Sequence, residues 1–231
     1  MNSNNDKGVY LALIAAIISG FSIFLNKFAV VAIKQPLVFT AVKNTIVGVL
    51  ILAIILVLKK WKDVKKLNRR DITYLLFIGV IGGSLPFYLF FTGLSQIPAV
   101  NAAIIQKTLI IWVAILAVPL LKERISKMQI LGIIMLFVGN LFVGGFKGFS
   151  FSKGESFVLL ATILWGIENV LAKKALKNID SDLVTAARMG FGSLLLLSAA
   201  AITNPTALAS VLTFTSRQWF WMILSSSLLL G

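Results

Sequence analysis

The segment from Pro36 to Arg70 reads PLVFTAVKNTIVGVLILAIILVLKKWKDVKKLNRR and joins a long apolar run to a basic one. Between Pro36 and Leu58 its only charged side chain is Lys43. A helix rises about 1.5 Å per residue, so about 20 mostly apolar residues cross the hydrocarbon core of a bilayer. The apolar run is therefore predicted to be a transmembrane helix, and the basic segment 59–70 after it is predicted to be a loop at the membrane surface.

The composition of the whole chain agrees with this prediction. Hydrophobic residues make up 58% of its 231 residues and charged residues only 13%, with a mean hydropathy of +0.96. A soluble domain is about 45–50% apolar and about 25% charged. The excess apolar surface has to face lipid, which predicts an all-α integral membrane protein whose partner is the lipid bilayer.

Charge and residue usage exclude several classes of site. The net charge is +14, but the basic residues lie beside apolar runs, where anionic lipid is the favoured partner, so no nucleic acid is expected. The chain has no Cys and no His. Disulfides, thiolate metal sites and His-based zinc sites or catalytic triads are therefore excluded, and neither a metal site nor a cofactor is expected.

Eight segments satisfy the length rule for a transmembrane helix. They lie near residues 9–32, 36–58, 72–94, 99–121, 127–146, 156–175, 183–202 and 217–231. If the N-terminus is cytoplasmic, most of the 22 Lys and Arg residues fall in the inner segments, as the positive-inside rule requires. We therefore expect a multi-pass protein of the plasma membrane with a cytoplasmic N-terminus.

Two distant segments of the chain are similar to each other. AAIISGFSIFLNKFA (15–29) aligns with ATILWGIENVLAKKA (161–175), and a shift of one residue aligns Lys43 with Arg188. The match is weak in identity, but it keeps its order over consecutive predicted spans. It indicates an internal repeat.

The repeating unit holds five predicted spans, and an odd number inverts the second copy in the membrane. The predicted fold is two inverted five-helix repeats, residues 1–148 and 149–231. The last span stops at Gly231, so the second repeat is expected to be incomplete, with about eight helices present and ten in the full fold. Inverted repeats are typical of transporters, whose two halves exchange roles around a site near the midplane.

The end of the first repeat carries motifs that identify a family. LKERIS at 121–126 lies at the turn after the fourth predicted span, and Gln129, Gly132 and Gly139 follow it. Together with LWG at 164–166 and a basic residue early in the second helix of each repeat, these motifs resemble the EamA-type transporters of the drug/metabolite transporter (DMT) superfamily. The resemblance implies ten helices in two inverted repeats and transport of small metabolites, without enzymatic activity.

One carboxylate is a candidate for function inside the membrane. Glu168 lies near the middle of the sixth predicted span, beside Asn169. An ionisable group at that depth costs about 2.5–3.5 kcal/mol on insertion scales and is a functional candidate by default. Glu168 either carries a proton in one transport state or pairs with a Lys or Arg of another helix, and both interpretations stay open.

Basic residues also fall inside predicted spans. They are Lys43 beside Asn44, Lys107 beside Gln106, and Arg188. If they face a common cavity, they favour a substrate with a carboxylate or phosphate, and a zwitterion could also use Glu168. Alternatively, Lys43 and Lys107 extend to the membrane surface, and the polar faces of their helices only point into the bundle.

The leading interpretation is a secondary transporter that moves small polar metabolites by alternating access. The metabolites are amino-acid-like or organic anions, and the transport is either coupled to protons or not. No GxxxxGK[ST] pattern is present, so ATP is not the direct energy source. The alternative is a truncated, non-transporting membrane protein or assembly partner, and a homodimer is left open. An enzyme acting on lipid head groups is disfavoured, because the nearest acidic pair, Asp180 and Asp182, lies among loop lysines that neutralise it.

Overall fold

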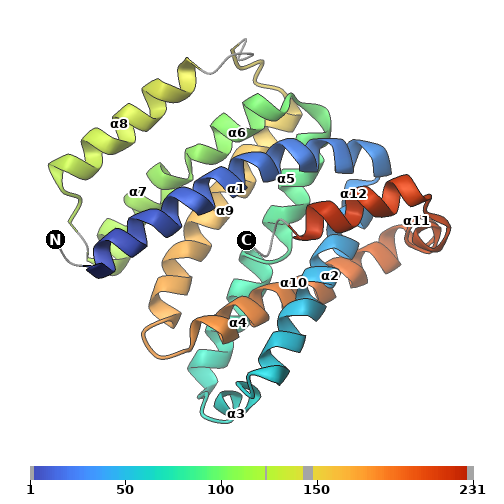
Figure 1. The fold of residues 1–231 in the computed structure, drawn as a ribbon, viewed down its shortest axis with the longest axis horizontal. Coiled ribbons are helices and arrows are strands. Elements are labelled where there is room, and N and C mark those ends of the chain that lie inside the picture. The colour runs from blue at the N-terminus through green and yellow to red at the C-terminus, as the bar shows by residue number, and fades with distance from the viewer. Residues whose placement is uncertain (1–2, 123, 143–147, 228–231) are drawn as a thin grey trace.

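The computed structural model describes residues 3–122, 124–142 and 148–227, and within these residues every regular element is a helix (Figure 1). The helices are α1 (Ser3–Ile33), α2 (Pro36–Val57), α3 (Trp61–Val64), α4 (Arg69–Ile81), α5 (Leu85–Gln96), α6 (Ala99–Lys107), α7 (Leu109–Leu121), α8 (Lys127–Leu141), α9 (Lys153–Ala175), α10 (Ser181–Thr203), α11 (Pro205–Ala209), the 3-10 helix η1 (Ser210–Thr213) and α12 (Ser216–Ser227). The all-α prediction is confirmed.

Six helical segments are long and apolar enough to cross a membrane. They are Leu13–Ile33, Pro36–Val57, Arg69–Gln96, Ala99–Leu121, Lys153–Ala175 and Ser181–Thr203. The other two predicted spans correspond to the shorter helices α8 and α12. A multi-pass membrane protein is therefore established, while the number of eight spans stays a prediction.

Two of these segments are interrupted once. The segment Arg69–Gln96 consists of α4 and α5, which are separated by Gly82 to Ser84. Pro86 lies in the first turn of α5, where its missing N–H costs no hydrogen bond. The segment Ala99–Leu121 is interrupted at Thr108, between α6 and α7. Backbone groups freed at such interruptions can be used by side chains of neighbouring helices.

Helices from the first half of the chain pack against helices from the second half (Figure 1). α2 packs most extensively against α10, and α4 and α5 pack against α9. α1 packs against α12 and runs beside α6, and α6 and α7 also contact α9. α8 lies at the edge of the molecule, and its apolar side chains are largely exposed, Met128 by 78%. Such a surface is expected to face lipid.

Glycines let α10 approach the interruption between α4 and α5. A Cβ atom placed on Gly192 would lie 2.6 Å from the Cα atom of Gly83, and one placed on Gly79 would lie 2.6 Å from the Cβ atom of Phe191. Real Cβ contacts are essentially never shorter than 3.0 Å. Small residues at this crossing allow direct backbone contact. The Gly79 and Gly83 spacing thus serves close helix packing.

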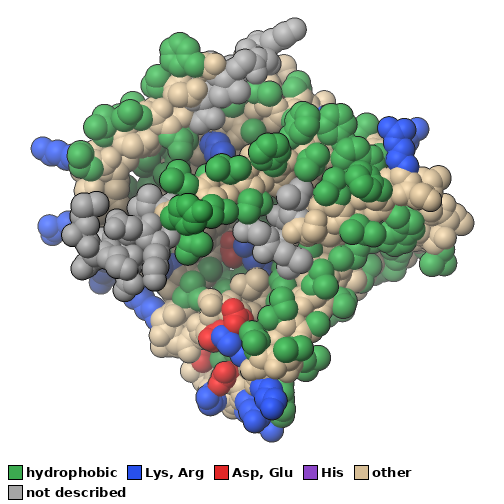
Figure 2. All heavy atoms as spheres, viewed as in Figure 1, with side chains coloured by type: hydrophobic (Ala, Val, Ile, Leu, Met, Phe, Trp, Pro, Cys, Tyr) green, Lys and Arg blue, Asp and Glu red, His purple; other side chains and the backbone are tan. Residues whose placement is uncertain are grey.

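An ion-pair cluster joins two loops at one end of the bundle. Lys60 follows α2 in the chain, and Asp180 and Asp182 lie at the start of α10. The Lys60 ammonium nitrogen lies 2.9 Å from a carboxylate oxygen of Asp180 and 2.5 Å from one of Asp182. Acidic and basic side chains gather at this end in Figure 2, whereas hydrophobic side chains are spread over much of the rest of the face shown. Asp180 and Asp182 are neutralised as expected, but by Lys60 from the other half of the chain. The segment after α2 and the loop before α10 therefore lie side by side, which agrees with their predicted location on one side of the membrane.

Candidate functional site

Lys43 is a fully buried lysine on α2. Its relative exposure is 0%, and its ammonium donates a hydrogen bond to the Asn26 side-chain oxygen on α1. The same nitrogen lies 4.7 Å from the ring centre of Phe91 and 5.5 Å from that of Phe39, close enough for cation–π attraction. The alternative that Lys43 extends to the membrane surface is therefore wrong. Its side chain ends among α1, α2 and α5.

The Lys43 side chain lines a cavity of about 180 Å³ between α1, α2, α5, α6 and α9. The residues around it are Ala15, Ile18, Ser19, Ser22, Ile23, Asn26, Lys43, Phe87, Phe90, Phe91, Gln106 and Trp165. Most of this wall is apolar or aromatic, with a few polar groups, which is the usual composition of a small-molecule site. We call this space the Lys43 cavity. It brings together Lys43 and Gln106, two of the residues predicted from the sequence.

Asn26 is the partner of Lys43 that sequence reasoning missed. Its amide group donates to the Ser22 carbonyl oxygen at 2.7 Å and to the Ser22 hydroxyl at 3.0 Å, which leaves the side-chain oxygen free to accept from Lys43. The spacing of Ser19, Ser22 and Asn26 places them on one face of α1. This polar face, inside an apolar helix, was the available signal.

Glu168 and Arg188 form an ion pair between α9 and α10. The Glu168 carboxylate lies 3.6 Å from the Arg188 guanidinium, and the two side chains are 4% and 30% exposed. Of the two roles considered for Glu168, pairing with a basic residue of another helix is the one this geometry displays. A role in proton coupling stays a prediction.

The interruption between α4 and α5 supplies a backbone acceptor beside this ion pair. The Gly82 carbonyl oxygen accepts from the Trp165 indole N–H at 3.3 Å and from Arg188 Nε at 3.5 Å. The guanidinium carbon of Arg188 also lies 5.7 Å from the centre of the Phe87 ring. Phe87 and Trp165 line the Lys43 cavity as well. Phe87 and Trp165 therefore lie beside both the Lys43 cavity and the ion pair of Glu168 with Arg188.

The remaining predicted residues lie elsewhere. The Asn44 amide donates to the Gly83 carbonyl oxygen at 3.0 Å, and the Asn44 side-chain oxygen has no hydrogen-bond partner among the described residues. Asn169 is exposed and donates to the backbone oxygen of Trp165 at 2.8 Å. It therefore does not accompany Glu168 into the bundle interior.

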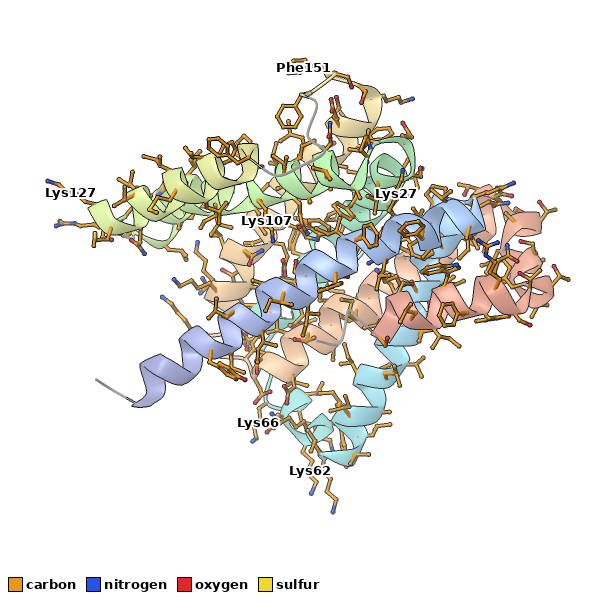
Figure 3. The ribbon with its side chains drawn as sticks, turned by 45° about the horizontal axis from the view of Figure 1, so that its top comes forward. Lys27, Lys62, Lys66, Lys107, Lys127 and Phe151 are labelled. Atoms are coloured by element: carbon orange, nitrogen blue, oxygen red, sulfur yellow. The ribbon has the colours of Figure 1, made fainter. Side chains whose placement is uncertain are left out.

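Lys107 is the last residue of α6 and does not line the Lys43 cavity. Figure 3 shows it near the junction of α6 and α7, where these helices pass α1. A cation at the C-terminal end of a helix is favoured by the helix dipole. The positive charge of Lys107 at this position is therefore explained by stabilisation of the end of α6.

The charges of the described residues favour an anion as the ligand of this site. Among the described residues, no group of three or more His, Cys, Asp or Glu side chains could hold a metal ion. Within the same residues, no carboxylate pairs with Lys43, whereas Glu168 and Arg188 neutralise each other. A small anion entering the Lys43 cavity would meet a cation without a counter-charge.

Comparisons with known proteins give consistent results. A model of the EamA-like transporter family matches residues 6–145 and 152–231. The uncharacterized transporter YyaM of Bacillus subtilis is 28% identical over 168 residues, which are 70% of this chain and 55% of that protein. An uncharacterized transporter of Clostridium kluyveri is 27% identical over 166 residues, 67% of this chain and 53% of its own length. The chain thus spans about half the length of these curated relatives.

A solved structure described as "Crystal structure of protein" is also similar. It has a TM-score of 0.62 and 16% sequence identity, and the match covers 90% of this chain and 73% of that chain. At this identity the likeness concerns the fold alone.

Proposed function

Because this chain belongs to the EamA-like transporter family, we propose that it is a secondary transporter of small polar metabolites, which it moves by alternating access. The observation that carries the proposal is the Lys43 cavity, with a fully buried ammonium in its wall. Burying such a charge is unfavourable, and ionisable residues held inside a membrane mark substrate or ion pathways. The substrate class is amino-acid-like or organic anionic.

The size of the cavity supports a small substrate. Its volume of about 180 Å³ lies below the range of about 300–1,000 Å³ typical of pockets for drug-sized ligands. The cavity also draws its walls from both predicted repeats, since α1, α2, α5 and α6 precede residue 149 and α9 follows it. A site at the interface of two repeats is the arrangement on which alternating access operates.

The packing of the helices supports an inverted repeat. α1, the first helix of the first half, packs against α12, and α9, the first long helix of the second half, packs against α4 and α5. These two contacts are equivalent if residues 1–148 and 149–231 are related copies, because each joins the first span of one copy to the third of the other. The contact of α2 with α10 then joins the two second spans.

The coupling and orientation that we propose follow from charge placement. Glu168 is the candidate proton carrier, because it is a carboxylate buried in the middle of α9. The N-terminus is placed in the cytoplasm and the chain in the plasma membrane, since the basic loop 59–70 then lies inside.

The experiment is uptake into proteoliposomes that contain the purified chain. A set of labelled amino acids and small carboxylates is offered to the unaltered protein, to Lys43→Met and to a control, Lys153→Met. Lys153 is an exposed lysine whose ammonium also lies over a phenylalanine ring, 5.6 Å from the centre of Phe157. We expect saturable uptake of at least one solute, lost in Lys43→Met and kept in Lys153→Met. Absence of saturable uptake for every solute would refute transport, and undiminished uptake by Lys43→Met would exclude this cavity as the route.

A further inference from the structure

We propose that the Lys43 cavity selects a small monocarboxylate, an anion of charge −1 without an ammonium group, which serves as the counter-ion of Lys43. This inference rests on the proposed transport function and narrows its substrate class. It starts from the imbalance of charge in the cavity wall.

Among the residues that the structure describes, Lys43 is the only charged one that lines the cavity. Its described contacts are one amide oxygen, from Asn26, and the faces of the Phe39 and Phe91 rings. All of these partners are neutral. A buried charge is stable when it is paired with an opposite charge, and a carboxylate in the cavity would complete such a pair.

The described wall of the cavity has no acidic side chain that could bind a cation. An amino acid brings an ammonium group that needs a carboxylate or several acceptors, and the lining residues of the cavity include no acid. Glu168 is the one described carboxylate at the middle of a span, and Arg188 already neutralises it at 3.6 Å. The ammonium of a zwitterion would in addition be confined close to Lys43, and like charges at short range repel.

The described wall of the cavity also has no second basic side chain that could bind a dianion. Arg188 pairs with Glu168, and Lys107 does not line the cavity. The second oxygen of a single carboxylate could be bound by Gln106, whose side chain lines the cavity and has no hydrogen-bond partner among the described residues. One cation and one neutral amide suit one carboxylate group.

The rest of the wall sets the shape of the substrate. Phe87, Phe90 and Trp165 present aromatic surface, and Ile18 and Ile23 present aliphatic surface. In a volume of about 180 Å³, these walls leave room for a short apolar chain attached to the carboxylate. Burial of that chain supplies affinity that does not depend on charge.

Four solutes with a four-carbon skeleton separate these charge requirements. Butanoate carries −1, 4-aminobutanoate is a zwitterion, butylamine carries +1 and succinate carries −2. Binding of each to the purified, unaltered chain is measured by the shift in melting temperature at matched ionic strength, because a ligand that binds only the folded state raises it. We expect butanoate to bind at least about tenfold more tightly than each of the other three. Equal or tighter binding of 4-aminobutanoate or succinate, or no butanoate binding, would overturn the proposal.

Variants then locate the bound anion. Lys43→Met should abolish butanoate binding, and Lys153→Met should leave it unchanged; retained binding in Lys43→Met would place the anion elsewhere and overturn the assignment. Should Lys43→Met fail to fold, Lys43→Gln removes the same charge with a polar side chain, and the solute series on the unaltered protein stands without any variant.

Uptake assays separate this inference from the proposed function. Selective butanoate binding without saturable uptake of any offered solute would refute transport and leave the charge selection intact. Saturable uptake of 4-aminobutanoate with no uptake of butanoate would support transport and refute the monocarboxylate.

Discussion

The ion pair between Glu168 and Arg188 predicts unequal effects of removing either partner. At 3.6 Å and an effective dielectric constant of about 20, the attraction is about 4–5 kcal/mol before the cost of desolvation is subtracted. Arg188→Gln leaves a carboxylate that is only 4% exposed without its partner, and breaking a buried pair in this way costs about 3–5 kcal/mol. Glu168→Gln leaves Arg188, which is 30% exposed and keeps the Gly82 carbonyl and the Phe87 ring. That loss should be about 1–2 kcal/mol.

A double-mutant cycle measures the pair directly. The free energy of unfolding of the unaltered chain, both single variants and Glu168→Gln/Arg188→Gln is obtained by titrating mixed micelles with a denaturing detergent. We expect the double variant to be more stable than Arg188→Gln alone, with an interaction energy of about 1–3 kcal/mol. Additive losses, or a larger loss in Glu168→Gln than in Arg188→Gln, would refute the pairing argument.

The same variants test whether Glu168 also couples transport to protons. If it does, Glu168→Gln abolishes proton-driven uptake in proteoliposomes while the protein stays folded. Full proton-driven uptake by that variant would leave Glu168 with a structural role alone.

Two further predictions concern the helix crossing and the loop ion pairs. Gly192→Ala should destabilise the chain by about 1–3 kcal/mol, because the new Cβ atom would lie 2.6 Å from the Gly83 Cα atom and closer still to the Gly83 carbonyl group. Gly190→Ala on the same helix places a Cβ atom where nothing lies within 4 Å, so it should stabilise the chain by about 0.5–1 kcal/mol. Changes in melting temperature of the same sign for the two variants would contradict this. The hydrogen bond from Lys60 lowers the pKa of Asp180, and the hydrogen bonds to Asp182 and Asp180 raise the pKa of Lys60. The stabilisation by the Asp180 carboxylate is therefore present above about pH 4 and is lost as the pH falls through the lowered pKa of Asp180. The stabilisation by the Lys60 ammonium is present below about pH 10 and is lost as the pH rises through the raised pKa of Lys60. The melting-temperature difference between the unaltered chain and Lys60→Met should be largest near neutral pH and shrink at both extremes, and a difference independent of pH would contradict the pairing.

Hydropathy and length were sufficient to predict the six helical segments that are long and apolar enough to span a membrane, because both properties belong to one segment at a time. The run from Pro36 to Leu58 was predicted as a span, and α2 (Pro36–Val57) confirms it. The family was also predicted correctly from motifs such as LKERIS, and the family match over residues 6–145 and 152–231 confirms it. The interruption at Gly82 to Ser84 was not predicted, since apolar residues continue on both sides of it.

The partners of the buried polar groups could not be read from one segment. Consecutive residues on a helix point about 100° apart, because a turn takes about 3.6 residues. Asn169 is accordingly exposed while its neighbour Glu168 is buried, and Gln106 lines the Lys43 cavity while Lys107 does not. The pairing of Glu168 with Arg188 depends on how α9 and α10 are placed against each other. That placement is a property of the assembled bundle.

The two sets of buried charge differ in a way that bears on which of them binds a solute. Glu168 and Arg188 satisfy each other, so a ligand that engaged either one would have to break an existing pair. The described contacts of Lys43 are all with neutral groups, so an anion gains a pairing there and breaks no ion pair among the described residues. Because Phe87 and Trp165 contact the surroundings of both sets, a solute that moves these rings also changes the packing around Arg188. Binding of an anion at Lys43 would in this way affect the packing of α9 and α10. Such a coupling would be measured as a change in the interaction energy between Glu168 and Arg188 when butanoate is bound.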